Sequence, residues 1–282
     1  MLKQRIITAL ILAPLVIAGI FFLPFSAFMI AIAAISLIGF WEWTQFVEAK
    51  SRIQAMIIPV VALGLSMLAL PINYQSMATL SASHHGMLLI GGIWWLIASI
   101  LALTYPASTS LWSKTPPLKH LFGLLTLIPF FWSILLLRAV NYEVDSTHGA
   151  KLVLLVCLIV WAADTGAYFS GKRFGKHKMA PAVSPNKTLE GLAGGVILAV
   201  FVAWGGAHIM SIPFHSVASL LTIAVITVIS SVLGDLVESM FKRVSGIKDS
   251  GNILPGHGGI LDRIDSLTAA FPVFALLYLW WM

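Results

Sequence analysis

Residues 217–233 read V-A-S-L-L-T-I-A-V-I-T-V-I-S-S-V-L and contain no charged side chain. A helix rises 1.5 Å per residue, so a run of this length covers most of the roughly 30 Å hydrocarbon core of a bilayer. The run therefore predicts a transmembrane helix.

Comparable apolar runs recur along the whole chain of 282 residues, of which 59% are hydrophobic and 10% charged. A soluble domain would be about 25% charged. We therefore expect an all-α, polytopic integral membrane protein with about nine transmembrane helices. The predicted spans are Ile6–Leu23, Ser26–Trp43, Ile53–Leu70, Met87–Tyr105, Leu118–Leu137, Leu152–Phe169, Leu189–Met210, Val217–Leu233 and Leu267–Trp281.

The positions of lysine and arginine predict the orientation, because basic loops are retained on the cytoplasmic side. If the N-terminus is cytoplasmic, only Arg138 and Lys151 of the 17 basic residues fall outside. We therefore expect a cytoplasmic N-terminus and an external C-terminus. The basic residues on the cytoplasmic side are then Lys3, Arg5, Lys50, Arg52, Lys114, Lys119, Lys172, Arg173, Lys176, Lys178, Lys187, Lys242, Arg243, Lys248 and Arg263.

The two parts of the chain differ in chemistry. Residues 1–150 form an N-terminal multi-span region with few ionisable groups, and residues 151–282 form a C-terminal membrane region that we expect to carry the site. The net charge of +6 does not predict a nucleic-acid partner, since the basic residues lie in loops between spans, where they set topology and meet anionic headgroups. The single cysteine, Cys157, excludes a disulfide framework.

One polar segment joins the last two spans, L-G-D-L-V-E-S-M-F-K-R-V-S-G-I-K-D-S-G-N-I-L-P-G-H-G-G-I-L-D-R-I-D-S at residues 233–266. If the preceding helix continues, Asp235, Glu238 and Lys242 share one of its faces. A solvated amphipathic helix end would explain one or two of these groups. Hard oxygen ligands beside basic residues and a glycine-rich turn are instead typical of Mg²⁺ bound with a polyphosphate.

A second polar segment runs from Trp161 to Gly195 and begins inside a span, with Asp164. An intramembrane carboxylate is a functional candidate, although pairing with a nearby polar side chain would also explain it. The later residues Ser184, Asn186, Lys187 and Glu190 surround the start of the next helix, whose N-terminus favours anions. They also fit a simple helix cap with Thr188 as the N-cap, and both roles can coexist.

The stretch from Ser239 to Asp265 resembles, position for position, the signature of the phosphatidate cytidylyltransferase (CDP-diglyceride synthase) family. The runs A-D-T-G-A-Y at 163–168 and S-P-N-K-T-x-E-G at 184–191 are also similar to family elements. The resemblance covers the C-terminal half, whereas residues 1–150 resemble the family only in being multi-span. The matching signature positions are Ser239, Lys242, Arg243, Lys248, Asp249, Pro255, His257, Gly258, Gly259, Asp262, Arg263 and Asp265.

The resemblance implies that CTP and phosphatidate give CDP-diacylglycerol and pyrophosphate, with Mg²⁺ as one or two metal ions. It implies phospholipid biosynthesis at the cytoplasmic face of a bacterial inner membrane. It also implies metal ligands at Asp235, Asp262 and Glu238, and catalytic roles for Asp235, Asp262, Asp265, Arg263 and Lys242. The expected substrate-binding residues are Ser184, Asn186, Lys187, Glu190, Arg243, Lys248, Asp249, His257, Gly258 and, from its place inside a span, Asp164.

Two other functions stay open at this point. A CTP-dependent polyisoprenoid or phytol kinase would also be multi-span and acidic at the membrane edge, but the complete signature argues against it. An ion-coupled transporter would use Asp164 as an ion site, yet it would also predict ionisable residues through the membrane rather than on one side. A homodimer is left open.

Overall fold

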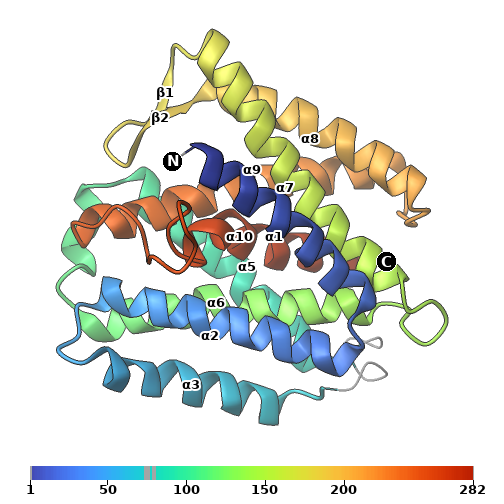
Figure 1. Cartoon of the computed structure of the whole chain (residues 1–282), viewed down its shortest axis with the longest axis horizontal. Coiled ribbons are helices and arrows are strands. Elements are labelled where there is room, and N and C mark those ends of the chain that lie inside the picture. The colour runs from blue at the N-terminus through green and yellow to red at the C-terminus, as the bar shows by residue number, and fades with distance from the viewer. Residues whose placement is uncertain (1, 73–76, 78–80, 282) are drawn as a thin grey trace.

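The computed structural model describes residues 2–72, 77 and 81–281, without the side chains of residues 2–7 and 9. The side chains of Lys3 and Arg5, which are predicted to be cytoplasmic, therefore lie outside the description. Nine α-helices occur in the described residues (Figure 1). They are α1 (Leu2–Phe22), α2 (Phe25–Val47), α3 (Arg52–Ala69), α5 (Ala82–Leu103), α6 (Pro116–Ala139), α7 (His148–Phe174), α8 (Leu189–Ile209), α9 (Val217–Val244) and α10 (Leu261–Trp281).

Eight of the described helices are long and apolar enough to cross a membrane, namely α2, α3 and α5 to α10. Helix α1 contains a shorter apolar stretch at Leu10–Phe22. Each predicted span overlaps one helix, so the expected all-α, polytopic membrane architecture is confirmed. The helices that carry the polar segments are longer than predicted. Helix α9 continues to Val244, and α10 begins at Leu261 rather than Leu267.

A small hairpin, which the apolar pattern did not predict, precedes α8. Its strands β1 (Lys178–Ala180) and β2 (Ser184–Thr188) are antiparallel, with Lys178 opposite Thr188 and Ala180 opposite Ser184. The predicted helix cap follows directly, because the Thr188 side chain accepts a hydrogen bond from the Gly191 N–H at 3.1 Å. The hairpin thus delivers its polar residues to the start of α8.

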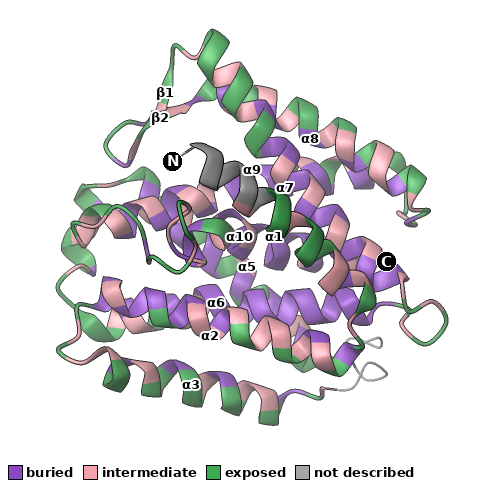
Figure 2. Cartoon of the chain, in the orientation of Figure 1, coloured by how far each residue is buried: buried purple, intermediate pink, exposed green. Residues whose placement is uncertain are grey.

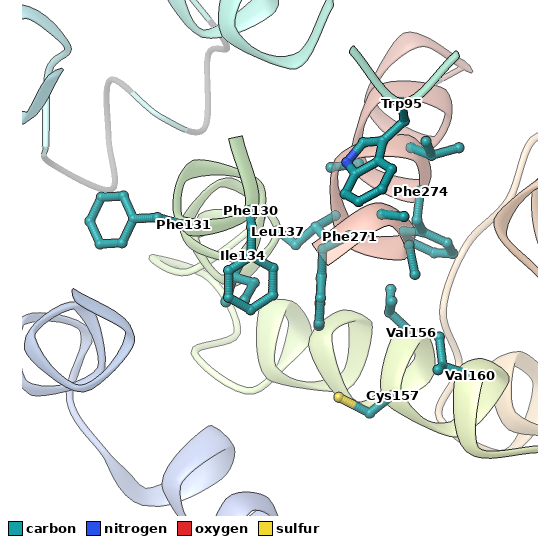
Figure 3. Packing of buried hydrophobic residues seen from close by; sticks show 14 of the residues in the cluster. Trp95, Phe130, Phe131, Ile134, Leu137, Val156, Cys157, Val160, Phe271 and Phe274 are labelled. Atoms are coloured by element: carbon teal, nitrogen blue, oxygen red, sulfur yellow. The ribbon is translucent and has the colours of Figure 1, made fainter. Parts of the chain in front are cut away.

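Helices α5, α6, α7 and α10 meet in a core of large apolar side chains. In Figure 3, Phe271 of α10 lies between Phe130 and Leu137 of α6 on one side and Val156 of α7 on the other. Residues 126–139 of α6 are all buried in the bundle (Figure 2), and α9 packs extensively against α10. Cys157 is a free, buried cysteine of this core, as expected for a packing residue.

Helices α7 and α8 form the most extensive helix pair, and glycines allow their backbones to approach closely. A Cβ atom added to Gly166 would lie 2.5 Å from the carbonyl oxygen of Gly194, and one added to Gly195 would lie 2.7 Å from that of Ala163. Small residues support such close packing between membrane helices. The contact holds Asp164 of α7 beside the hairpin that leads into α8.

The polar segments collect at one end of the bundle. In Figure 1 the hairpin and the α9–α10 connection lie on the left, whereas the α6–α7 turn and the end of α10 lie on the right. Arg138 and Lys151 flank that turn on the right. The predicted separation of basic residues therefore corresponds to two opposite ends, and the cytoplasmic location of the left end stays a prediction.

Candidate active site

The hairpin places Lys187 against the C-terminal half of α9. The Lys187 Nζ lies 2.7 Å from Asp235 Oδ2 and donates a hydrogen bond to the Val232 carbonyl at 3.0 Å. One helical turn further on, the Ser239 hydroxyl donates to Asp235 Oδ1 at 3.3 Å. Arg243, another turn later, donates through Nε to the Val183 carbonyl at 3.1 Å. Two predicted cations thus fasten the hairpin to α9.

A cavity of about 340 Å³ lies between α7, the hairpin, α8 and α9. Its wall combines apolar side chains with five predicted site residues, namely Asp164, Ser184, Asn186, Lys187 and Asp235. Asp164 also lies within electrostatic reach of Asp235, Lys187 and Arg263. The structure therefore brings together residues from the two polar segments, 161–195 and 233–266, which are separate in the sequence.

A second group of charges lies deeper, between α9 and α10. The Lys242 Nζ bridges Glu238 Oε2 at 3.2 Å and Asp262 Oδ1 at 3.0 Å. Asp265 lies close enough to Glu238 for their carboxyl groups to interact directly. The other Glu238 oxygen, Oε1, is buried and has no hydrogen-bond partner among the described residues. The carboxyl groups of Glu238, Asp262 and Asp265 are thus gathered around the single ammonium group of Lys242.

Asp262 occupies the first turn of α10 and is held by backbone groups of the preceding loop. Its Oδ2 accepts hydrogen bonds from the Ser250 N–H at 2.9 Å and the Gly259 N–H at 2.8 Å. Its own N–H donates to the Ser250 hydroxyl at 3.2 Å. These bonds use most of the accepting capacity of the carboxylate, so the loop and the helix start form one rigid unit.

The signature glycines shape this loop. Gly258 adopts φ +85°, a conformation that L side chains rarely adopt, and an added Cβ would lie 2.6 Å from Asp262 Oδ2. The glycine-rich turn was expected to bind an anion through its N–H groups. In the structure, the Gly259 N–H binds the carboxylate of Asp262. The predicted contact of Gly258 and His257 with nucleotide stays a prediction.

Several predicted residues lie outside the cavity wall and the carboxylate cluster. Glu190 accepts hydrogen bonds from the backbone N–H groups of Lys176 at 3.0 Å and His177 at 3.2 Å, so its carboxylate holds the approach to the hairpin. Lys248 and Asp249 are exposed in the α9–α10 loop. Their substrate-binding roles stay predictions.

Sequence reasoning missed Glu42 of α2, which lies within the N-terminal region yet contacts the signature loop. Glu42 is 1% exposed, and its carboxylate accepts a hydrogen bond from the Leu261 N–H at 2.7 Å. The signal was present in the sequence, because an acidic residue in the apolar run 26–43 is a functional candidate by the same rule that singled out Asp164.

The donor chemistry of the site suits a hard divalent cation. Among residues 2–72, 77 and 81–281, no group of three or more His, Cys, Asp or Glu side chains already has the arrangement of a metal site. The cluster nevertheless contains more carboxylates than cations, and the orphaned Glu238 Oε1 offers a buried oxygen ligand. Oxygen donors of this kind are those that Mg²⁺ prefers.

Comparison with known proteins agrees with the resemblance. The model of the cytidylyltransferase family matches residues 3–281. The chain is 45% identical to the phosphatidate cytidylyltransferase of Haemophilus influenzae, an alignment that covers 99% of each chain. It is 42% identical to the enzyme of that name from Pseudomonas aeruginosa, over 99% of this chain and 97% of the relative, and 34% identical to that from Bacillus subtilis. The chain therefore belongs to the cytidylyltransferase family and is a nucleotidyltransferase of the membrane.

Proposed function

We propose that the chain transfers CMP from CTP to phosphatidate, giving CDP-diacylglycerol and pyrophosphate. The observation that carries this proposal is the meeting of Lys187, Asp235 and Asp164 at one cavity, beside the cluster around Lys242. Such an arrangement suits substrates that are themselves phosphates. The names of three relatives that align over nearly their full length support the choice of phosphatidate.

The reaction needs no protein nucleophile. An oxygen of the phosphatidate phosphate forms a bond to the α-phosphorus of CTP, and the bond from that phosphorus to the bridging oxygen of the β-phosphate breaks. Pyrophosphate leaves with the electron pair. Both reactants are anions, so the barrier is largely electrostatic and the enzyme must supply cations at fixed positions. We assign this role to Lys187, Lys242 and Arg263.

Asp235, Glu238 and Asp262 would hold Mg²⁺, with Asp265 as an auxiliary ligand. The cation supplies positive charge that stabilises the phosphate oxygens as the bond changes. Charge balance supports its presence, because the carboxylates of Asp164, Asp235, Glu238, Asp262 and Asp265 are accompanied in the cluster by Lys187, Lys242 and Arg263. Asp235 and Glu238 have the less occupied oxygens, since Asp262 already accepts bonds from Ser250, Gly259 and Lys242.

The site end of the bundle would face the cytoplasm of a bacterial cell from its inner membrane. CTP then arrives from water, and phosphatidate arrives from the leaflet. The basic asymmetry of the loops supports this orientation. Reporter fusions after residue 180 and at the C-terminus should report opposite sides of the membrane, and the same side for both would contradict the orientation.

A homodimer stays a prediction, and no contact between two copies of the chain supports it. Chemical crosslinking of the protein in native membranes, followed by gel electrophoresis, would reveal a species of twice the monomer mass if the chain forms one.

The decisive experiment separates cytidylyl transfer from phosphorylation and transport. Purified protein is incubated with CTP, Mg²⁺ and either phosphatidate or a polyprenol. Cytidylyl transfer predicts pyrophosphate release that requires phosphatidate. Release of CDP with the polyprenol would identify a kinase instead. If CTP is consumed with neither phosphatidate nor the polyprenol, the proposal is overturned.

A further inference from the structure

Glu42 makes a buried polar contact that crosses from the N-terminal region to the signature loop. Its Oε1 accepts a hydrogen bond from the Ile260 N–H at 3.0 Å, and its Oε2 accepts bonds from the Leu261 N–H at 2.7 Å and the Ser250 hydroxyl at 3.1 Å. Helix α10 begins at Leu261, so these N–H groups belong to the helix end that has no intrahelical acceptors. Glu42 therefore caps α10 from a different helix.

The cap is linked directly to Asp262 through one side chain. Ser250 donates its hydroxyl to Glu42 and its backbone N–H to Asp262, and its hydroxyl also accepts the Asp262 N–H. Ser250 is fully buried. A movement of the Glu42 carboxylate would thus be transmitted through Ser250 to the carboxylate and to the backbone N–H of Asp262.

Two glycines of the loop are shaped around the same carboxylate. A Cβ atom at Gly251 or at Gly259 would lie 2.4 Å from an oxygen of Glu42, which is closer than real Cβ atoms are found. Gln45, one turn after Glu42, donates its side-chain amide to the Ser250 carbonyl. The end of α2 therefore holds the loop, and the two glycines permit the close approach.

The contact is electrostatically favourable. The N-terminus of a helix carries a partial positive charge, and a carboxylate there is stabilised. A buried carboxylate is costly without such partners, which makes a fully bonded Glu42 a rigid support.

We propose that Glu42 is a positioning residue, which fixes the start of α10 so that Asp262 and Lys242 present their charges in the geometry of the site. The inference rests on the proposed role of Asp262 in the metal and phosphate site. Glu42 has no assigned contact with substrate and acts through Ser250 and the backbone of residues 259–261.

The test compares Glu42→Gln with a matched control on the same helix end. Glu48 is the C-cap residue of α2, and its side chain is more than half exposed and pairs with Lys119. Glu42→Gln replaces an acceptor oxygen by an NH₂ group that faces N–H donors, whereas Glu48→Gln removes the charge that pairs with Lys119, whose side chain is buried. The measurement is turnover against Mg²⁺ and CTP concentration, per folded molecule, in detergent.

Loss of a residue that orients a metal ligand typically reduces metal affinity or activity by about 10- to 100-fold. We therefore expect Glu42→Gln to raise the Mg²⁺ concentration for half-maximal turnover by about tenfold and to lower kcat, with excess Mg²⁺ restoring part of the loss. Glu48→Gln leaves the buried Lys119 without its carboxylate and should lower stability, but turnover and the Mg²⁺ requirement per folded molecule should stay within about twofold of the wild type. A merely structural residue would lower the amount of folded protein but leave the Mg²⁺ requirement unchanged.

A compensating pair keeps the test decisive if Glu42→Gln does not fold. Gly251→Ala should lower turnover because its Cβ would meet the Glu42 side chain, to which its three nearest atoms all belong. Glu42→Asp shortens that side chain by one methylene, so the double variant should recover part of the activity that Gly251→Ala loses. Losses that simply multiply in the double variant would contradict the proposal.

Asp262→Asn belongs in the same panel. If Asp262→Asn is inactive while Glu42→Gln keeps the wild-type kcat and Mg²⁺ requirement, the positioning role alone is overturned. If Asp262→Asn keeps full turnover, the proposed site itself is wrong, whatever Glu42→Gln does.

Discussion

The two ends of the helix bundle both carry carboxylates beside lysines, but their partners come from different distances along the chain. At the α6–α7 turn, Asp145 accepts hydrogen bonds from the Thr147 N–H and hydroxyl at 2.8 and 2.6 Å and pairs with Lys151 at 3.2 Å. At the opposite end, Asp235 pairs with Lys187 of the hairpin, and Glu42 binds a loop more than two hundred residues away.

The sequence distance between a carboxylate and its partners thus distinguishes the solvated α6–α7 turn from the site, which forms only when distant segments pack together. The hydrogen bonds from Thr147 lower the pKa of Asp145 to about 2, so this group is a carboxylate at neutral pH and contributes stability that is lost only as the pH falls toward that value. Its partners Thr147 and Lys151 lie within six residues of it in the sequence. The contacts of Asp235 and Asp262 exist only when helices, hairpin and loop have packed together, which is what a site for two substrates requires.

The largest expected effect comes from Asp235→Asn and Asp262→Asn, because each removes anionic oxygen that a hard cation needs while keeping size and packing. Turnover should fall by about 100-fold or more in either variant. The two losses should be strongly non-additive, since either one disables the same site. Mg²⁺-dependent CTP turnover in matched membranes, corrected for protein level, provides the measurement. Near-normal turnover by Asp262→Asn would exclude the role proposed for it.

Asp164→Asn should have an intermediate effect. Asp164 lies in the cavity wall near the Lys187–Asp235 pair, so the change removes one negative charge from the cavity without removing that pair. We expect turnover to fall by about tenfold, with the thermal midpoint of unfolding in detergent unchanged within error. Full activity in this variant would return Asp164 to a structural role.

Lys176→Ala and Lys178→Ala should have small effects although both lysines lie at the site end. Both side chains are exposed, Lys178 in β1 and Lys176 just before it, and exposed charges contribute little through screened interactions. Turnover should fall by less than about tenfold in each variant. A loss as deep as that of the aspartate variants would mean that the site lies elsewhere on this end.

Asp145→Asn should have the smallest effect on catalysis, because its partners are local and lie at the far end of the bundle. Turnover should match the wild type within about twofold. The same CTP assay measures it, and a strong loss would show that the two ends are coupled.

Much of the architecture followed from the sequence because lipid imposes a single rule on long apolar runs. Each of the nine predicted spans overlaps a helix, eight of the described helices are long and apolar enough to cross a membrane, and the Thr188 cap was predicted correctly. The hairpin was missed because its strands are short and polar, so neither alternation nor apolarity marks them. The extension of α10 to Leu261 was missed because its first turn is charged, and charge alone cannot distinguish a loop from a helix start capped by Glu42.

The candidate site was predictable in its members but not in its contacts. Asp235, Asp262 and Lys242 stood out by residue type, spacing and resemblance, whereas the pairing of Lys187 with Asp235 depends on how the hairpin crosses α9. The loop glycines are required by close packing, since Gly259 faces Glu42 and Gly258 faces Asp262, and their contact with nucleotide stays a prediction. These pairings and close approaches are contacts between distant segments, so they become visible only in the folded chain.

The central claim is that carboxylates from separate helices form one divalent-cation site at the hairpin end. Binding of Mn²⁺, used as a spectroscopic substitute for Mg²⁺, tests it most directly in the purified protein with CTP present, by electron paramagnetic resonance. The wild type and Asp145→Asn should bind Mn²⁺ equally, and Asp235→Asn should bind it about tenfold or more weakly. Equal affinity in Asp235→Asn and the wild type would contradict the account.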